Sequence, residues 1–501
     1  MKSKIHINAV FSLLQVIITS LIILISYKYL ITKLGVEKLG VWSLIVASVS
    51  ILNVGSLGLS STLVKYVAKY LVIKNHERIS SIIQTALITV VIASIVLLVI
   101  VSVLANILLK AIVPENQMVL ATSLLPFSLL NVGLLLPAGI ILSAFDGAQK
   151  IYLRNLLLIT SSILFLILVF FLIPLFDLLG VVYAQLWQSV FTLFFGWFTL
   201  RRVFPFLPVL PYRWEQNTLR EIIGYGTNLQ LITIFQMLYE PVTKSVLTIF
   251  GGLVAVGYYE LANRLVLKTR EMILSMFQVL IPVYASQIEN DSEKIKSTYS
   301  KSINYLLFLS IPIFSLLVMV IPLISVFLIG SFEDQFYIIC IILLCSWFIN
   351  IINAPAYFAF LGIGLLRWNV LSHLTIGILN LALCYLCGFY LGGTGTVLGW
   401  AIALSLGSLI ILFKFNSLQK IRFYKIIIKE NKILFLVNAV IIIIFILVKF
   451  LFATLSYNLY ANAIFILVFI LISLYFIWNH SVRQDLFNSF KLLFSFRLRN
   501  Y

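Results

Sequence analysis

The sequence has 501 residues, of which 62% are hydrophobic and only 10% are charged, and its formal net charge is +18 at pH 7. Ordinary soluble domains carry about 25% charged residues, so this composition excludes a water-soluble globular fold. Apolar runs of about 20 residues recur along the whole chain, which is the length of a helix that crosses a bilayer. We therefore expect an all-α integral membrane protein.

These apolar runs predict about fourteen transmembrane helices. The first run follows Lys2 and Lys4, exceeds the apolar core of a signal peptide and precedes no small-residue cleavage site, so we interpret it as an uncleaved span. In chain order, the predicted spans are 8–30, 41–64, 80–109, 118–143, 155–176, 179–200, 222–250, 253–285, 303–330, 335–361, 368–391, 395–415, 432–452 and 459–480.

The basic residues predict the orientation of these spans. With a cytoplasmic N-terminus, 26 of the 35 Lys and Arg residues fall in cytoplasmic segments and five fall on the outer side. This asymmetry obeys the positive-inside rule and supports an even number of spans, with both termini in the cytoplasm. It also explains the net charge, so that binding of nucleic acid is not needed to account for it. We expect a multi-pass protein of the inner (plasma) membrane.

The loops predict a protein that is not an enzyme. The longest of them, at about 201–221, 286–302 and 416–431, are all cytoplasmic, and no outer loop has room for a catalytic domain. No Walker-type motif for ATP is present, and the four histidines show no metal-ligand spacing. Cys384 and Cys387 form a C-x-x-C pair inside an apolar run, where packing is the expected role. No cofactor or metal is therefore expected.

The chain shows an internal repeat. The segment Gly35–Trp42 corresponds to Gly252–Tyr259 at an offset of 217 in the numbering, and Ala144–Gly147 corresponds to Ala359–Gly362 at an offset of 215. Gly180 and Gly395, each at the start of a span, are also related by an offset of 215. Six spans per repeat is an even number, so the two copies run in parallel, as in some transporters.

The repeat predicts three parts. Residues 1–212 form an N-terminal six-helix bundle and residues 213–420 form a second one. Residues 421–501 add two further transmembrane helices and a basic cytoplasmic tail. The two bundles are pseudo-symmetric, and the expected binding cavity lies between them.

The seventh and eighth spans carry seven ionisable residues: Glu240, Lys244, Glu260, Arg264, Lys268, Arg270 and Glu271. At about 3 kcal/mol each, their insertion costs on the order of 20 kcal/mol before pairing. Lys244 lies near the depth of Glu260 on the neighbouring antiparallel helix, and Glu240 near the depth of Arg264, which predicts two crossed ion pairs. Two interpretations stay open: the charges fasten two helices together, or they line a water-filled cavity.

The cavity interpretation assigns roles to these side chains. Arg264, Lys268, Arg270 and Lys244 are candidates for binding a pyrophosphate or acidic sugar. Glu240, Glu260 and Glu271 are candidates for binding a coupling Na⁺ or H⁺. Four further basic residues are candidates for a cytoplasmic vestibule, although the orientation rule alone also explains them: Lys65, Lys69, Arg154 and Arg367.

Several stretches resemble a known family. The segment Tyr29–Trp42, together with Leu57-Gly58-Leu59 and Lys65-Tyr66, is similar to the first hairpin of the bacterial polysaccharide exporters. The stretches Val256–Arg264 and Pro282–Ser286 are similar to the eighth span of that group. The chain thus resembles the Wzx-type O-antigen or capsule repeat-unit flippases of the MATE-like (multidrug/oligosaccharidyl-lipid/polysaccharide, MOP) superfamily.

This resemblance implies two six-helix bundles around a cationic lumen, alternating access and use of an ion gradient. It also implies a substrate, an undecaprenyl-pyrophosphate-linked oligosaccharide, which moves from the cytoplasmic to the periplasmic (outer) leaflet among membrane lipids. A polysaccharide polymerase and a chain-length regulator are the implied protein partners. Glu260 and Arg264 lie within the family-like stretch.

Three alternatives stay open from the sequence. A multidrug or metabolite cation antiporter of the same superfamily typically has twelve spans, and the basic residues here disfavour a cationic substrate. A flippase for a lipid-linked cell-wall precursor differs from the leading interpretation only in its substrate. A membrane glycosyltransferase or polymerase is disfavoured by the short outer loops.

Overall fold

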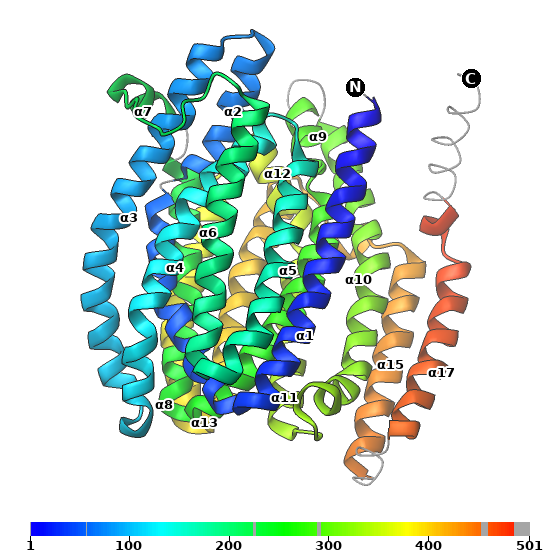
Figure 1. The fold of residues 1–501 in the computed structure, drawn as a ribbon. Helices are drawn as coiled ribbons and strands as arrows, with labels where there is room; N and C mark the ends of the chain where they lie inside the picture. The colour runs from blue at the N-terminus through cyan, green and yellow to red at the C-terminus, as the bar shows by residue number, and fades with distance from the viewer. Residues whose placement is uncertain (1, 57, 224–226, 288–291, 452–458, 485–501) are drawn as a thin grey trace. The chain divides into compact units, whose positions relative to one another are not determined.

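The computed structural model describes residues 2–56, 58–223, 227–287, 292–451 and 459–484, and in this part of the chain every regular element is a helix. Figure 1 shows them in chain order. The elements are α1 (Lys2–Val49), η1 (Ser50–Ser56), α2 (Leu59–Val72), α3 (His76–Ile112), α4 (Glu115–Gly147), α5 (Ile151–Phe176), α6 (Leu178–Val203), α7 (Gln216–Ile223), α8 (Thr227–Phe277), α9 (Leu280–Gln287), α10 (Ser292–Ile329), α11 (Asp334–Ile352), α12 (Ala354–Ile363), α13 (Arg367–Leu418), α14 (Phe423–Ile426), α15 (Lys429–Leu451) and α17 (Leu459–Trp478).

Three of these helices are too long to cross a bilayer once. α1, α8 and α13 contain 48, 51 and 52 residues, which at 1.5 Å per residue is more than twice the hydrocarbon thickness of about 30 Å. Each contains one glycine with non-helical backbone angles: Gly35 (φ 81°), Gly252 (φ 74°) and Gly392 (φ 65°). A positive φ is readily adopted by glycine, so each helix has a position at which it can fold back.

Contacts across these glycines show that the chain reverses there. The Tyr27 and Trp42 ring centroids lie 6.1 Å apart, whereas a straight helix between them would separate them by about 22 Å. Lys244 and Glu260 form an ion pair across Gly252. The Cys384 thiol donates to the Thr396 carbonyl across Gly392. Each of the three long helices is therefore a hairpin of two spans.

Splitting the hairpins recovers the predicted number of spans. Eleven helices in the described ranges are long and apolar enough to cross a membrane, and three of them are the hairpins, which gives fourteen segments. They follow the predicted spans in order. The prediction of an all-α membrane protein with about fourteen helices is thus confirmed.

Two predicted spans are less regular than expected. The second changes into the 3₁₀ segment η1 at Ser50 and resumes only at Leu59. Gly55 and Gly58 favour this break because glycine is a poor helix former, and Gly58 has a φ of 66°. The tenth span divides into α11 and α12 at Asn353, and Pro355 lies in the first turn of α12. Proline has no N–H to continue the hydrogen bonds of α11, but it is tolerated in the first turn of a new helix.

The internal repeat is visible in how the backbone packs. A Cβ atom on Gly147 would lie 2.8 Å from the Val67 Cβ, and one on Gly362 would lie 2.8 Å from the Tyr284 Cβ. These two pairs of residues are related by the repeat offsets of 215 and 217. The backbone angles of the turn at Asp177 (φ 55°, ψ −135°) are close to those of the turn at Gly392 (φ 65°, ψ −148°). These two turns are also related by the repeat offset of 215.

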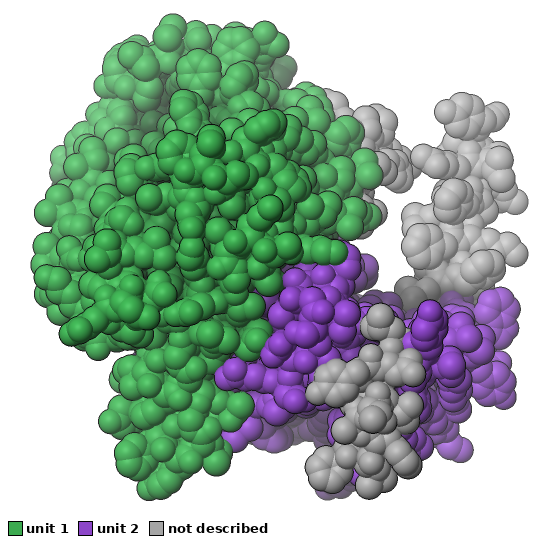
Figure 2. Space-filling view, turned by 60° about the horizontal axis from the view of Figure 1, so that its bottom comes forward, with its two compact units in different colours: residues 1–260, 380–396 green, residues 261–379, 397–501 purple. Residues whose placement is uncertain are grey.

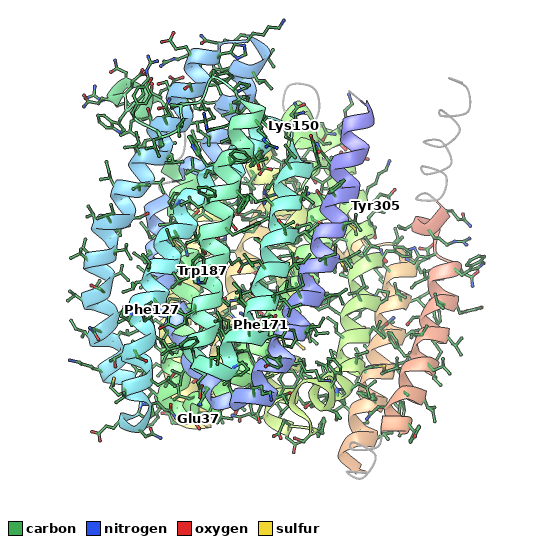
Figure 3. All side chains as sticks on the ribbon, in the orientation of Figure 1. Glu37, Phe127, Lys150, Phe171, Trp187 and Tyr305 are labelled. Atoms are coloured by element: carbon green, nitrogen blue, oxygen red, sulfur yellow. The ribbon has the colours of Figure 1, made fainter. Side chains whose placement is uncertain are left out.

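The chain divides into two compact units, drawn in green and purple in Figure 2. Unit 1 contains residues 1–260 and 380–396, and unit 2 contains residues 261–379 and 397–501. In unit 1 the N-terminal end of α1, the linker helix α7 and Lys150 lie at one end, and Glu37 lies at the other (Figures 1 and 3). The start of the chain and the linker after the sixth span are therefore on the same side of this unit.

The surface of unit 1 carries an apolar band suited to lipid. Phe171 of α5 and Trp187 of α6 are 69% and 60% exposed and point away from the helices (Figure 3). Apolar residues along α3 are about as exposed; they include Ile92, Ile95, Val96, Val99, Val103 and Ile107. Contiguous apolar faces of this length are not left in water.

In unit 2, the last two spans are fastened to α10 by a buried polar network. Asn431 of α15 donates to the Asn304 side-chain oxygen at 2.9 Å, and its own side-chain oxygen lies 3.0 Å from His480 Nε2. Such a network fixes the register of apolar helices, because an unpaired amide inside a membrane is costly.

The predicted domain boundaries fall between helices. Residue 212 lies between α6 and α7, and residue 420 between α13 and α14. The division into domains at these positions stays a prediction. The basic tail, residues 485–501, lies outside the described residues.

Candidate functional site

A lysine is buried among the membrane-spanning helices of unit 1. Lys244 Nζ of α8 lies 2.8 Å from Glu260 Oε2 and 3.0 Å from Glu240 Oε2. The side chains of Lys244 and Glu260 are 0% and 2% exposed, and that of Glu240 is 35% exposed. Removing such charges from water is expensive unless they are paired. One ammonium between two carboxylates supplies this pairing.

The Glu260 carboxylate is completed by two hydroxyl groups from α1. Tyr27 donates to Oε1 at 2.7 Å, and Ser43 donates to Oε2 at 2.8 Å, the same oxygen that accepts from Lys244. Hydrogen bonds to an ionised carboxylate are stronger than bonds between neutral groups. We refer to Tyr27, Ser43, Glu240, Lys244 and Glu260 as the Glu260 cluster.

The two hairpins bring these residues together because of their equal distances from the turns. Tyr27 and Ser43 lie eight residues before and after Gly35, and Lys244 and Glu260 lie eight residues before and after Gly252. Eight helical residues span about 12 Å, which places all four side chains at one depth. The repeat offset of 217 relates Tyr27 to Lys244 and Ser43 to Glu260, so the cluster joins equivalent positions of the two repeats.

This arrangement settles one of the two predicted ion pairs. The Lys244–Glu260 pair is confirmed, and the roles of these two side chains in fastening helices or lining a cavity stay predictions. The pair between Glu240 and Arg264 stays a prediction. Sequence reasoning missed Tyr27 and Ser43, although the offset that relates Gly35 to Gly252 also assigns them to Lys244 and Glu260.

The other charged residues of α8 belong to unit 2. Lys268 and Glu271 form a partly exposed ion pair of 2.7 Å. The Arg270 Nε donates to the Asn350 side chain at 2.9 Å, and its guanidinium lies 4.8 Å from the centre of the Trp347 ring. Arg264 is half-buried. The roles of these residues in binding a substrate or an ion stay predictions.

The vestibule candidates lie beside aromatic or acidic side chains. Lys65 and Lys69 lie on α2, and their ammonium groups lie 5.7 and 5.8 Å from the Tyr66 ring. In the same unit, Arg154 Nε lies 3.6 Å from Asp146 Oδ2. In unit 2, Arg367 lies over Trp368, with 4.9 Å from its guanidinium to the ring centre.

A second polar network, which the sequence did not indicate, attaches the linker helix α7 to α2 and α3. Arg78 Nη2 lies 3.1 Å from Glu221 Oε2, and the other carboxylate oxygen of Glu221 accepts a hydrogen bond from the Tyr70 hydroxyl. Hydrogen bonds from Ser81 and Thr218 lower the pKa of Glu215 to about 2. Glu215 is therefore ionised at any physiological pH, and the attachment of α7 does not depend on its titration.

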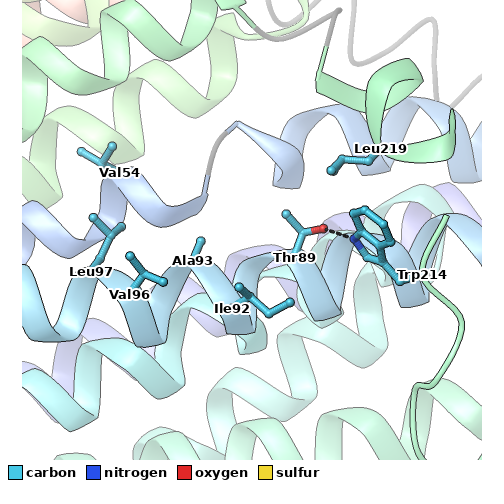
Figure 4. Close-up of a pocket in the computed structure, with 8 residues that line it drawn as sticks. All are labelled: Val54, Thr89, Ile92, Ala93, Val96, Leu97, Trp214 and Leu219. Carbon is cyan, nitrogen blue, oxygen red and sulfur yellow. Dashed lines mark hydrogen bonds between the residues drawn. The ribbon is translucent and has the colours of Figure 1, made fainter. Parts of the chain in front are cut away.

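An apolar pocket of about 410 Å³ lies beside α3 under this linker (Figure 4). Its polar groups are few, and the Trp214 indole already donates to the Thr89 hydroxyl at 3.1 Å. The other lining residues are Val54, Ile92, Ala93, Val96, Leu97 and Leu219. Such a pocket suits a hydrocarbon chain and offers no cation to a pyrophosphate.

The fold is that of known membrane transporters. An inward-facing multidrug resistance MATE transporter of the MOP superfamily superimposes with a TM-score of 0.70 at 17% identity, over 80% of this chain and 94% of that chain. The lipid II flippase MurJ, in an inward closed conformation, also gives 0.70 at 17% identity, over 94% of this chain and 97% of that one. A MOP superfamily transporter from Pyrococcus furiosus gives 0.61 at 16% identity, over 84% and 96%. At these identities the likeness shows the fold alone.

The sequence comparisons add the family. No curated protein sequence matches the chain. The family model described as "Polysaccharide biosynthesis protein" matches residues 6–288, which confirms the resemblance to the polysaccharide-exporter branch of the MOP superfamily. Because this match spans more than half of the chain, the protein belongs to the polysaccharide biosynthesis protein family.

Proposed function

We propose that this protein is a flippase that moves undecaprenyl-pyrophosphate-linked oligosaccharide repeat units from the cytoplasmic to the outer leaflet of the plasma membrane by alternating access. The observation that carries the proposal is a conjunction: a member of a polysaccharide biosynthesis family has the fold of a transporter. In the described ranges, the loops on the predicted outer side are short and leave no room for glycosyl transfer. Transport of a lipid-linked intermediate is the step of polysaccharide synthesis that such an architecture can perform.

The proposed substrate contacts follow from charge. Arg264, Lys268 and Arg270 of α8 supply cations for a pyrophosphate, which arginine binds through paired hydrogen bonds. The sugars follow the headgroup, while the prenyl chain stays among membrane lipids. We propose that a polymerase and a chain-length regulator act on the product at the outer face.

The coupling ion is proposed to be H⁺ or Na⁺, bound by the carboxylates of α8. At Glu240 and Glu260 the position between the two carboxylates is occupied by the Lys244 ammonium. A Na⁺ ion would have to displace this tethered cation, and a proton would have to break the ion pair of the carboxylate that it joins.

Two other functions are compatible with the same fold. A multidrug antiporter is supported by the MATE likeness, but that structure covers 80% of this chain, whereas the MurJ structure covers 94%. A cell-wall precursor flippase is supported by the MurJ likeness. Loss of the gene would raise drug sensitivity in the first case and would be lethal in the second, whereas the proposed function predicts viable cells without surface polysaccharide.

Replacing Arg264 tests the proposed substrate contact. We expect Arg264→Ala, expressed in a deletion strain, to reduce surface polysaccharide at least tenfold. The reason is that a charged contact between arginine and the pyrophosphate in the transition state of translocation contributes more than about 1.4 kcal/mol. Arg264→Lys should retain part of the activity. Lys110→Ala, which removes an exposed cation of α3, is the matched control. Normal polysaccharide from an Arg264→Ala strain with normal protein levels would contradict the proposal.

A further inference from the structure

We propose that the end of α3 beneath the α6–α7 linker is a binding site for one anionic phospholipid. Its two acyl chains lie on opposite faces of α3, in two apolar pockets that we call the first and second α3 pockets, and its headgroup lies beside the linker. The inference goes beyond the proposed transport function and does not depend on it. All of the residues that carry it belong to unit 1.

Two apolar pockets flank α3. The first α3 pocket is the one of about 410 Å³, which Trp214 and Leu219 line at one end (Figure 4). The second has a volume of about 580 Å³, lies among α3, α4 and α6, and is also lined by Leu210 and Pro211 of the linker. Both volumes lie within the range of about 300–1,000 Å³ that is typical of sites for small molecules.

The two pockets lie on opposite faces of α3. One face lines the first pocket and includes Thr89, Ala93 and Val96. Another lines the second pocket and includes Leu87, Val91 and Ser94. At 100° per residue these two sets point in roughly opposite directions. An exposed ridge separates them, in which Ile92 borders the first pocket and Ile95 the second. A lipid with two acyl chains can straddle this ridge, whereas a single prenyl chain would have to bend over it.

The polar side chains of the pockets already have partners within the protein. In the second pocket, the Ser94 hydroxyl donates to the Val90 carbonyl at 2.6 Å, and the Trp197 indole donates to the Val209 carbonyl at 2.8 Å. In the first pocket, the indole of Trp214 donates to a threonine hydroxyl. A hydrocarbon chain leaves these bonds intact and makes dispersion contacts with the apolar walls.

The linker crosses α3 between the two pockets. The Gln84 side-chain oxygen accepts hydrogen bonds from the backbone N–H groups of Tyr212 and Arg213, both at 3.1 Å. On either side of this crossing, Leu210 lines the second pocket and Trp214 lines the first. One lipid with a chain in each pocket therefore contacts the linker twice, and its headgroup lies at the crossing.

The charge around the crossing favours an anionic headgroup. Residues 74–78 and 201–221 contain six basic and three acidic residues, and the three glutamates form ion pairs with Arg78 or Arg213. Arg201 lies one helical turn beyond the second pocket, and its Nη atoms have no hydrogen bond to the residues that the structure describes. Under the predicted orientation this end of α3 faces the cytoplasmic leaflet, whose anionic lipids attract basic residues.

Native mass spectrometry of the purified protein tests the two-chain site with dioleoyl phosphatidylglycerol and its one-chain lyso form. We expect the two-chain lipid to bind at least about tenfold more tightly, because its second chain binds as part of the same molecule. Ala93→Phe, which fills the first pocket, should lower this preference to about threefold or less. Ala111→Phe, the same change at an exposed position near the other end of α3, is the matched control. Equal affinities of the two lipids for the unchanged protein, or equal losses in the two variants, would overturn the site.

Arg201→Gln tests the headgroup. The unchanged protein should bind phosphatidylglycerol more tightly than dioleoyl phosphatidylcholine, which has no net charge. Arg201→Gln should weaken the binding of phosphatidylglycerol roughly fivefold, which corresponds to about 1 kcal/mol, and leave that of phosphatidylcholine unchanged. Lys33→Gln, which removes an exposed cation on the predicted outer side, is the control.

Two outcomes of these measurements would overturn the proposal. Equal affinities of phosphatidylglycerol and phosphatidylcholine for the unchanged protein would contradict an anionic headgroup. Tighter binding of undecaprenyl phosphate than of phosphatidylglycerol, lost in Ala93→Phe, would assign the pockets to the transported lipid. Neither outcome bears on whether the protein transports an oligosaccharide, which leaflet exchange of the labelled substrate measures separately.

Discussion

Single residues show how this chain tolerates charge inside a membrane. Lys244 is fully buried, but it has two carboxylates within 3.0 Å on its own hairpin. Glu260 in turn accepts hydrogen bonds from Lys244 and from the neutral hydroxyls of Tyr27 and Ser43. Each partner is needed because the cost of a buried charge returns when its counter-charge is removed.

Replacing Lys244 should therefore destabilise the protein strongly. We expect Lys244→Met to lower the free energy of unfolding by about 3–5 kcal/mol, since it removes the ammonium that pairs with the buried Glu260 carboxylate. Adding Glu260→Gln should recover part of this loss. Lys268→Met, which removes the partly exposed pair with Glu271, should cost about 1 kcal/mol or less. Thermal unfolding of the purified variants in detergent measures the difference, and equal shifts for the two lysine variants would refute it.

The sequence predicted this site in part. Charged side chains in apolar spans are conspicuous, so Glu240, Lys244 and Glu260 could be found from burial cost alone. Tyr27 and Ser43 are ordinary residues of membrane helices, and only their positions relative to Gly35 distinguish them. The partners of Arg270 come from α11, a helix distant in the sequence, and carry no local signal.

Among the structural elements, the hairpins depend on glycines in two different ways. Gly35, Gly252 and Gly392 adopt positive φ angles at the turns. Gly40 and Gly257 are helical, but their missing side chains allow a carbonyl of the other hairpin to approach. The first kind is needed for backbone conformation and the second for contact between hairpins.

Replacing Gly40 tests the contact between hairpins without changing a turn that needs a positive φ. A Cβ atom there would overlap the Leu253 carbonyl, so Gly40→Ala should destabilise the protein by about 1–3 kcal/mol, the usual cost of overpacking. Gly139→Ala is the control, because its Cβ would meet only the Ser60 hydroxyl at 3.8 Å, and it should be neutral or slightly stabilising because alanine favours helix. If thermal unfolding showed no difference between the two variants, the close contact would not exist in the membrane.

Element positions were predictable where the apolar pattern was long and unbroken, as in α5 and α6. Hydropathy did not reveal that the second span passes through η1, because Ser50–Ser56 remains apolar enough to continue a span. It also gave no sign of the division between α11 and α12 beyond Pro355. Such breaks depend on neighbouring helices that supply partners for the freed backbone groups.

At the scale of the whole molecule, the first twelve spans are a repeat whose two copies carry different side chains at equivalent positions. Positions 27 and 43 carry hydroxyls, and the corresponding positions 244 and 260 carry a cation and an anion. The repeat keeps the turns and the glycine contacts while the side chains between them differ. The glycine contacts between the two hairpins are therefore symmetric, whereas the charges of the Glu260 cluster belong to only one of the two repeats.

Leaflet exchange in proteoliposomes tests the central claim most directly. Purified protein is reconstituted with a fluorescent undecaprenyl-pyrophosphate-linked oligosaccharide, and a membrane-impermeant quencher reports how much of it reaches the outer leaflet under an imposed H⁺ or Na⁺ gradient. The account predicts that the quenched fraction of the fluorescent substrate exceeds the fraction that was in the outer leaflet at the start. It also predicts that Arg264→Ala slows this further quenching. Quenching that stops at the plateau of protein-free vesicles under both gradients would contradict the account.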